Sequence, residues 1–243
     1  MSRVPSRSTA PASVGLHGRR PGDPSPDPLP LRVAHRAIRA DLQRLTGAAD
    51  ELVTGAPLPP ARAKALARYV ELFCDSVHHH HTLEDDVLWP VLAGAAGAAL
   101  DLHELQDDHA ALDDQLDALR RSARGLVTAG RRTRDAGGTA ALAAFASAVT
   151  GVAALLEEHM SDEDATVLPA IERYLSVEQW AEVERQAGKS KPDLGFELPR
   201  IVDVTTPEEF ATLTAALPRL LVRVARLVAE RPFRRRQRLA FGS

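Results

Sequence analysis

The chain has 243 residues, enough for one good core and a small appended unit but not for two full domains. Alanine, leucine, arginine and acidic residues dominate and only 4% of residues are aromatic, which favours helices. The net charge of −3 gives no whole-protein reason to expect nucleic acid or a membrane as a partner. A single cysteine, Cys74, excludes an internal disulfide, so we expect a buried thiol and a cytoplasmic location.

Residues 1–30 are rich in proline, serine, glycine and arginine and have few large apolar side chains, so we expect a disordered tail. Arg19 and Arg20 are followed by PGDPSPDPLP rather than by an apolar run. We therefore predict neither a secretory nor a twin-arginine signal.

A first helix is predicted from residue 31 to the turn at Gly55, and a second from about 61 to 89. His35 occupies a position on the apolar stripe of the first helix. In the second helix, His80 lies four residues before Glu84 and His81 lies four before Asp85, so helical spacing alone allows either pair. We expect Pro90 to end or kink this helix.

A third helix is predicted at 100–126, with His109 on its apolar stripe and an acidic face toward solvent. The fourth, at 139–174, carries His159 and Glu163 on the same face as its larger apolar residues, and we expect Pro169 to interrupt it. Residues 136–156 lack charge over the length of a membrane span, but their larger apolar residues recur every three or four positions. That pattern is typical of a bundle helix, and we predict no transmembrane segment.

The remaining residues, 176–243, are predicted to be a helical extension. Capping boxes that begin at Ser176 and Thr206 predict helices from about 177 and 207, and residues 189–204 look irregular. A last helix is expected at 218–230, with its leucines and valines inward. The basic end at 231–238 suits either an anionic partner or the helix dipole, and we favour the dipole. A protein partner for the extension has no support in the pattern.

An internal repeat joins the two halves of the chain. His80, Glu84 and Pro90 have the same spacing as His159, Glu163 and Pro169, so the repeat selects His80 over His81. We interpret His78, His79 and His81 as solvated. Imidazole and carboxylate suit iron, manganese or zinc, and two helical hairpins, each with a lone histidine, would form a dinuclear site in a bundle core. The predicted metal ligands are His35, His80, Glu84, His109, His159 and Glu163.

The order His, His-x-x-x-Glu, His, His-x-x-x-Glu resembles the hemerythrin-like (HHE cation-binding) family over residues 31–175. The strings HRAIRADL (35–42) and HHTLEDDVLWP (80–90) are close to the usual form of that family. The extension resembles that of larger bacterial members. The resemblance implies an all-α fold, an antiparallel four-helix bundle with short C-terminal accessory helices.

The resemblance also implies a centre of two iron ions bridged by Glu84, Glu163 and an oxo or hydroxo group. His35 and His80 would serve one iron, and His109 and His159 the other. Oxygen-carrying hemerythrins have a further histidine four residues after the third-helix histidine. Here that residue is Asp113, so Asp113 or water is expected in its place. We expect Asp85, Glu158 and Asp164 to orient the imidazoles.

Two function classes follow from this site. The first is a non-haem di-iron protein that binds or senses dioxygen, nitric oxide, peroxide or iron itself. The second is a di-iron enzyme that disproportionates peroxide, as a catalase does, or acts on nitric oxide. Iron storage is less favoured, because the sequence has no second set of carboxylate sites.

Overall fold

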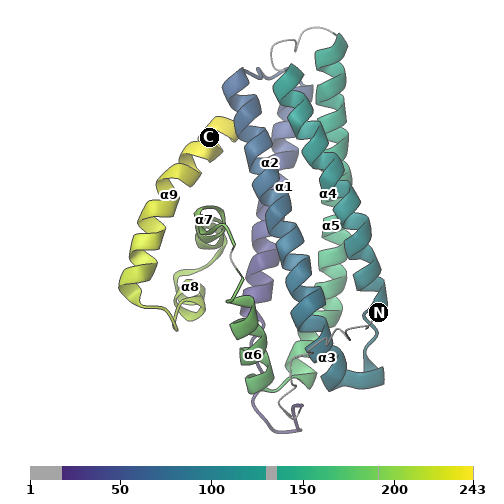
Figure 1. Ribbon diagram of the computed structural model, residues 1–243, viewed down its shortest axis with the longest axis vertical. Coiled ribbons are helices and arrows are strands. Elements are labelled where there is room, and N and C mark those ends of the chain that lie inside the picture. The colour runs from purple at the N-terminus through teal and green to yellow at the C-terminus, as the bar shows by residue number, and fades with distance from the viewer. Residues whose placement is uncertain (1–17, 130–135, 191, 243) are drawn as a thin grey trace, which may run out of the picture.

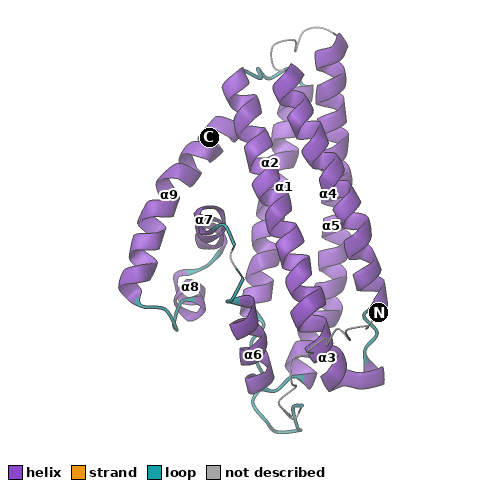
Figure 2. Cartoon of the chain, in the orientation of Figure 1, coloured by secondary structure: helices purple, strands orange, loops and turns teal. Residues whose placement is uncertain are grey.

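The structure, a computed structural model, describes residues 18–129, 136–190 and 192–242. Within these ranges all regular elements are helical and no strand occurs (Figures 1 and 2). The predicted all-α fold is therefore confirmed. The tail expected at residues 1–17 lies outside the described residues.

Four long helices form the bundle: α1 (Leu29–Val53), α2 (Pro60–Leu83), α4 (His103–Ala129) and α5 (Ala136–Tyr174). Each packs against two neighbours, since α1 lies beside α2 and α5, and α4 also lies beside α2 and α5 (Figure 1). Proline in the first turn of α1 and of α2 suits a helix start, where its missing N–H has no helical acceptor.

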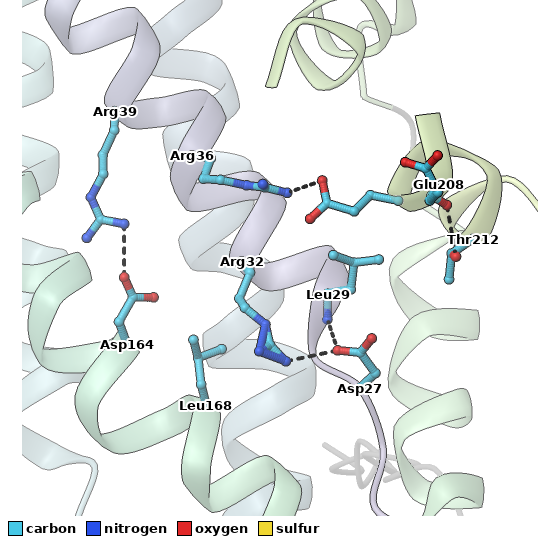
Figure 3. A pocket seen from close by; sticks show the side chains of 10 residues that line it. Asp27, Leu29, Arg32, Arg36, Arg39, Asp164, Leu168, Glu208 and Thr212 are labelled. Carbon is cyan, nitrogen blue, oxygen red and sulfur yellow. Dashed lines mark hydrogen bonds and ion pairs between the residues drawn. The ribbon is translucent and has the colours of Figure 1, made fainter. Parts of the chain in front are cut away.

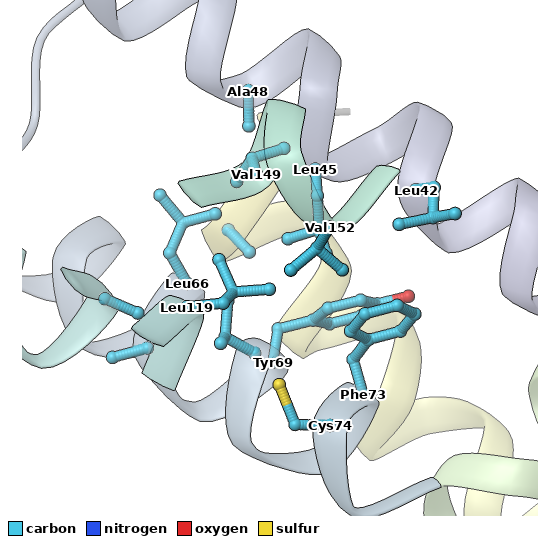
Figure 4. Close-up of a cluster of buried hydrophobic side chains, with 14 of the residues drawn as sticks. Leu42, Leu45, Ala48, Leu66, Tyr69, Phe73, Cys74, Leu119, Val149 and Val152 are labelled. Carbon is cyan, nitrogen blue, oxygen red and sulfur yellow. The ribbon is translucent and has the colours of Figure 1, made fainter. Parts of the chain in front are cut away.

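Two clusters of apolar side chains fill the bundle. The larger cluster includes Leu42, Leu45, Tyr69 and Phe73 (Figure 4), and its members from α5 are Phe145, Val149, Val152, Leu156 and Met160. The smaller cluster lies further along the helices and contains Leu31, Leu88, Trp89, Leu105, Val167 and Ile171. Cys74 belongs to the larger cluster, as predicted, and burial raises the pKa of its thiol to about 12.

The prolines of the repeat act differently in its two copies. After α2 the backbone forms a π turn, η1 (Glu84–Leu88), in which Trp89 N–H donates to the carbonyl of Glu84. Pro90 then lies in the first turn of α3 (Trp89–Ala96), and a 3₁₀ turn, η2 (Gly97–Ala99), follows. The break expected at Pro90 is thus a π turn. The interruption expected at Pro169 is wrong, because α5 continues to Tyr174 with Leu168 and Ile171 buried on either side.

Of the described helices, the one over Gly137–Tyr174 is long and apolar enough to cross a membrane, judged by length and composition alone. It also supplies apolar side chains to both clusters.

Part of the disordered tail predicted from composition, residues 18–28, makes defined contacts with the bundle. Arg19 N–H donates to the Tyr174 carbonyl at 3.1 Å, and Ser25 Oγ donates to the Glu172 carbonyl at 3.0 Å. These contacts attach residues 18–28 to the end of α5, so the expectation of disorder is wrong for this part.

The extension contains α6 (Val177–Ala187), α7 (Leu194–Val204), α8 (Pro207–Leu213) and α9 (Arg219–Phe241). Both predicted capping boxes are present. The irregular stretch expected at 189–204 is wrong in its second half, where Asp193 caps α7. The last helix runs past Pro232 to Phe241, and the apolar residues expected to face inward are exposed instead: Leu220, Leu221, Val224, Leu227 and Val228.

A buried arginine attaches this extension to the bundle. Arg200 of α7 donates to Asp41 Oδ2 at 2.5 Å and to Ser76 Oγ at 2.7 Å, and Tyr69 donates to the other oxygen of Asp41. Phe196 and Phe233 of the extension pack around Tyr69 as part of the larger apolar cluster. The extension therefore shares the core of the bundle.

We predict that Arg200→Met destabilises the protein by about 3 kcal/mol, because it leaves the Asp41 carboxylate buried without its main cation. Urea unfolding followed by circular dichroism measures this change. Arg185→Ala, which removes an ion pair at the surface, is the control and should leave the urea midpoint unchanged. Equal midpoints for Arg200→Met and the wild type would show that this contact does not hold the extension.

Candidate metal centre

A layer of buried polar side chains separates the two apolar clusters. In α1, α4 and α5, and in α2 continued by η1, the polar residues lie between a residue of one cluster and a residue of the other, as His35 lies between Leu31 and Ile38. We call these residues the polar layer: His35, His80, His81, Glu84, His109, His159 and Glu163. All are buried except His80, which is nearly so.

The polar layer contains two groups of potential ligands. His35, His80, Glu84 and Glu163 offer donor atoms within 4.8 Å of one another, and so do His81, His109 and His159. The two groups are in contact, since His109 Nε2 and His159 Nε2 are 3.1 Å apart and Nε2 of His109 is 3.8 Å from Glu84. The six residues predicted as ligands therefore lie together.

The two glutamates each extend between the groups. Glu84 has Oε1 at 3.3 Å from His80 Nε2 and Oε2 at 3.8 Å from His109 Nε2. Glu163 has Oε2 at 3.2 Å from His35 Nε2 and Oε1 at 3.5 Å from His159 Nε2. Each carboxylate thus presents one oxygen to each group, which is the arrangement of a bridging ligand.

The polar layer lacks the hydrogen bonds that buried polar atoms normally make. Within the described part of the chain, both oxygens of Glu84 and of Glu163 have no hydrogen-bond partner, and neither do His35 Nε2 and His80 Nε2. Unpaired buried polar atoms are costly. Because these atoms are imidazole nitrogens and carboxylate oxygens directed at one another, bound cations would satisfy them, and the residues fit a metal centre.

The electrostatics of the layer agree with this reading. Burial, together with Glu163 and Asp85, raises the pKa of Glu84 well above its usual value. Burial and the neighbouring imidazoles lower the pKa of His80 far below its usual value and that of His81 to about 2. The two histidines are therefore neutral, the form that donates a lone pair to a metal.

Each lone histidine is held by an aspartate from the opposite hairpin. His35 Nδ1 lies 2.7 Å from Asp164 of α5, and His109 Nδ1 lies 3.0 Å from Asp85 of η1. Burial lowers the pKa of His35, but Asp164 and Glu163 outweigh that effect and raise it. These contacts leave Nε2 of each ring directed into the layer.

Two further residues lie outside the polar layer and contact it or its aspartate partners. Arg39 donates to the second oxygen of Asp164 at 2.9 Å (Figure 3), and Asp108 lies 3.7 Å from His159 Nδ1. The expected roles of Asp85 and Asp164 thus agree with the structure. Glu158 is exposed, and among the described residues no hydrogen bond or ion pair joins its carboxylate to these histidines, so its expected role is wrong.

His81 is the residue that the sequence interpretation missed. It is 3% exposed, and its ring stacks on that of His109 with centroids 4.2 Å apart. Asp113 does not fill the position expected for it, because it pairs with His78 at the protein surface. His81 instead completes the second group, from a different helix. The sequence did contain a signal for this. The position four residues after His109, which is histidine in oxygen-carrying hemerythrins, is Asp113 here, and His81 lies directly beside the predicted ligand His80.

The comparisons with known proteins agree with this site. A family model described as hemerythrin HHE cation binding domain matches residues 30–171, more than half of the chain. No curated protein matches the chain. No solved structure matches it either.

We predict that His81→Ala weakens the binding of a divalent metal by at least about tenfold, because it removes one imidazole of the second group. Titration of Fe²⁺ into the metal-free protein under anaerobic conditions, in competition with a chelator, measures the affinity for Fe²⁺. His78→Ala is the matched control, since His78 is an exposed neighbour in the same run, and it should bind as the wild type does. If the two variants bind Fe²⁺ equally well, His81 is not a ligand.

Proposed function

Because the chain belongs to the hemerythrin HHE cation-binding family, we propose that its polar layer holds two iron ions. We further propose that they bind or sense a small oxidant such as dioxygen, nitric oxide or peroxide. The single observation that carries this proposal is the placement of Glu84 and Glu163, each with one oxygen toward each group of histidines. A single ion would not need two carboxylates that both extend between two sets of imidazoles.

In this proposal His35 and His80 serve one iron, and His81, His109 and His159 serve the other, with the two glutamates shared. Mixed imidazole and carboxylate donors suit iron better than a thiolate-preferring metal. When bound, a pair of iron ions supplies two electrons to a small oxidant. The oxo or hydroxo bridge of the family belongs to the same proposal.

The two sides of the centre differ in the number of donors that the chain provides. His81, His109 and His159, with one oxygen of each glutamate, provide three imidazoles and two carboxylate oxygens. His35 and His80, with the other oxygen of each glutamate, provide two imidazoles and two carboxylate oxygens. The side of His35 and His80 therefore has the more open coordination. We propose that the external molecule binds there.

Access is consistent with this choice of side. A cavity of about 670 Å³ lies between α1, α5 and α8, and Asp164, the hydrogen-bond partner of His35, lines it together with Arg39 (Figure 3). The apolar clusters on both sides of the layer exclude bulk water and limit entry to small molecules. Arg39 donates to Asp164, and Asp164 pairs with His35 Nδ1, so the wall of the cavity is linked to the orientation of His35.

The more open coordination at the side of His35 and His80 also favours a second candidate function, peroxide disproportionation. Peroxide is small and polar, and charged side chains line the cavity: the arginines Arg32, Arg36 and Arg39 and the carboxylates Asp27, Asp164, Glu208 and Glu209. An enzyme would use the open side repeatedly, whereas a sensor or carrier would bind there and release.

We predict that protein purified after iron supplementation contains two iron ions per chain and absorbs in the near ultraviolet through charge transfer to ferric iron. Metal analysis and the optical spectrum check this. Glu163→Gln should lose at least one iron per chain, because the shared carboxylate is gone, while Glu158→Gln, an exposed neighbour, should keep both. Iron content below one per chain in well-folded wild-type protein would refute the di-iron proposal.

Oxygen release from peroxide distinguishes the two candidates. We predict that the iron-loaded protein reacts with peroxide for about one turnover per centre and then stops, as expected of a binding or sensing site. An oxygen electrode, with the optical spectrum recorded in parallel, measures this. Sustained oxygen release with an unchanged spectrum would instead identify a peroxide-disproportionating enzyme.

A further inference from the structure

The first half of α9, together with Leu217 two residues before it, exposes an apolar face. Six large apolar side chains are between 48% and 74% exposed: Leu217, Leu220, Leu221, Val224, Leu227 and Val228. They make up more than half of the exposed large apolar residues of the described chain. The second half of the helix behaves differently, since Phe233 and Ala240 are buried against the bundle.

These side chains share one side of the helix. At about 100° per residue, Leu220, Leu221, Val224, Leu227 and Val228 fall within an arc of about 120°. The opposite side, with the half-buried Val222 and Ala225 and the buried Ala229, faces the protein. The apolar face is therefore continuous, and α9 forms an outer edge of the molecule, on the far side of α7 from the bundle (Figure 1).

The charged residues of α9 are almost all positive. The helix has eight arginines and one acidic residue, Glu230. Arg219, Arg223 and Arg226 lie on one flank of the helix, about 80°, 40° and 100° around the axis from the edge of the apolar arc at Leu227, and all three are exposed. Among the described residues, neither Arg219 nor Arg223 has an acidic partner within 4.0 Å, and Arg226 has only Glu230 at 3.7 Å.

We propose that this face of α9 docks on the surface of an anionic lipid bilayer. The apolar arc would enter the boundary between headgroups and acyl chains, and the guanidinium groups on this flank would contact lipid phosphates. Long arginine side chains can reach from this flank to the headgroup level. An exposed apolar strip beside exposed arginines, of which Arg219 and Arg223 have no acidic partner among the described residues, is the combination that such a surface satisfies.

A second copy of the chain fits this face less well. Pairing two copies of α9 along their apolar strips would bring two sets of arginines together with only one glutamate from each helix. An anionic bilayer covers the apolar residues and neutralises the arginines at once. Docking would hold the polar layer near a membrane, but the proposal does not depend on the metal centre.

The test is co-sedimentation of the full chain with vesicles. We expect the protein to sediment with vesicles of equal parts phosphatidylglycerol and phosphatidylcholine and to stay in solution with phosphatidylcholine alone. Leu220→Glu combined with Leu227→Glu should abolish binding, and replacing Arg219, Arg223 and Arg226 by glutamine should weaken it at least tenfold. Val53→Glu is the control, because Val53 is an exposed apolar residue on α1, and it should bind like the wild type.

Circular dichroism of each variant confirms that it is folded, as expected for substitutions at exposed positions. Failure to bind anionic vesicles, equal binding to neutral vesicles, or binding that survives the double glutamate substitution would overturn the proposal. Light scattering that shows a dimer lost in the double variant, without vesicle binding, would assign the face to a second copy. Binding of duplex DNA alone would assign the arginines to nucleic acid. Either outcome also overturns the membrane proposal.

Discussion

The structure depends on a layer of carboxylates and imidazoles enclosed in the apolar interior of a four-helix bundle. Glu84 and Glu163 are buried, and in the described part of the chain their oxygens have no hydrogen-bond donors. Without a cation these atoms oppose folding, because burial and mutual repulsion disfavour the charged form of Glu84. With cations the same atoms would join all four bundle helices at one point, so metal binding and the stability of the bundle should be linked.

Features set by local spacing could be predicted from the sequence. The repeated His-x-x-x-Glu places an imidazole and a carboxylate on one helix face whatever surrounds it, and the capping boxes at Ser176 and Thr206 are equally local. His81 could not be chosen by the same rule. It lies about 100° around the helix from His80, and it faces the layer only because α4 and α5 approach that side.

The extension shows the same limit of sequence reasoning. Arg200 lies in a stretch that looked irregular, and its partner Asp41 is 159 residues away, so no periodicity connects them. The inward face predicted for α9 was wrong for a related reason. An apolar stripe shows that a surface must be covered, but not whether this chain covers it, and here the bundle reaches only the second half of the helix.

Diffraction from crystals of the iron-loaded protein, recorded on both sides of the iron absorption edge, tests the central claim most directly. The account predicts two anomalous peaks inside the bundle. One should lie next to His35 and His80 and the other next to His81, His109 and His159, with a carboxylate oxygen of Glu84 and of Glu163 beside each peak. A single peak, or none within this layer, would contradict the account.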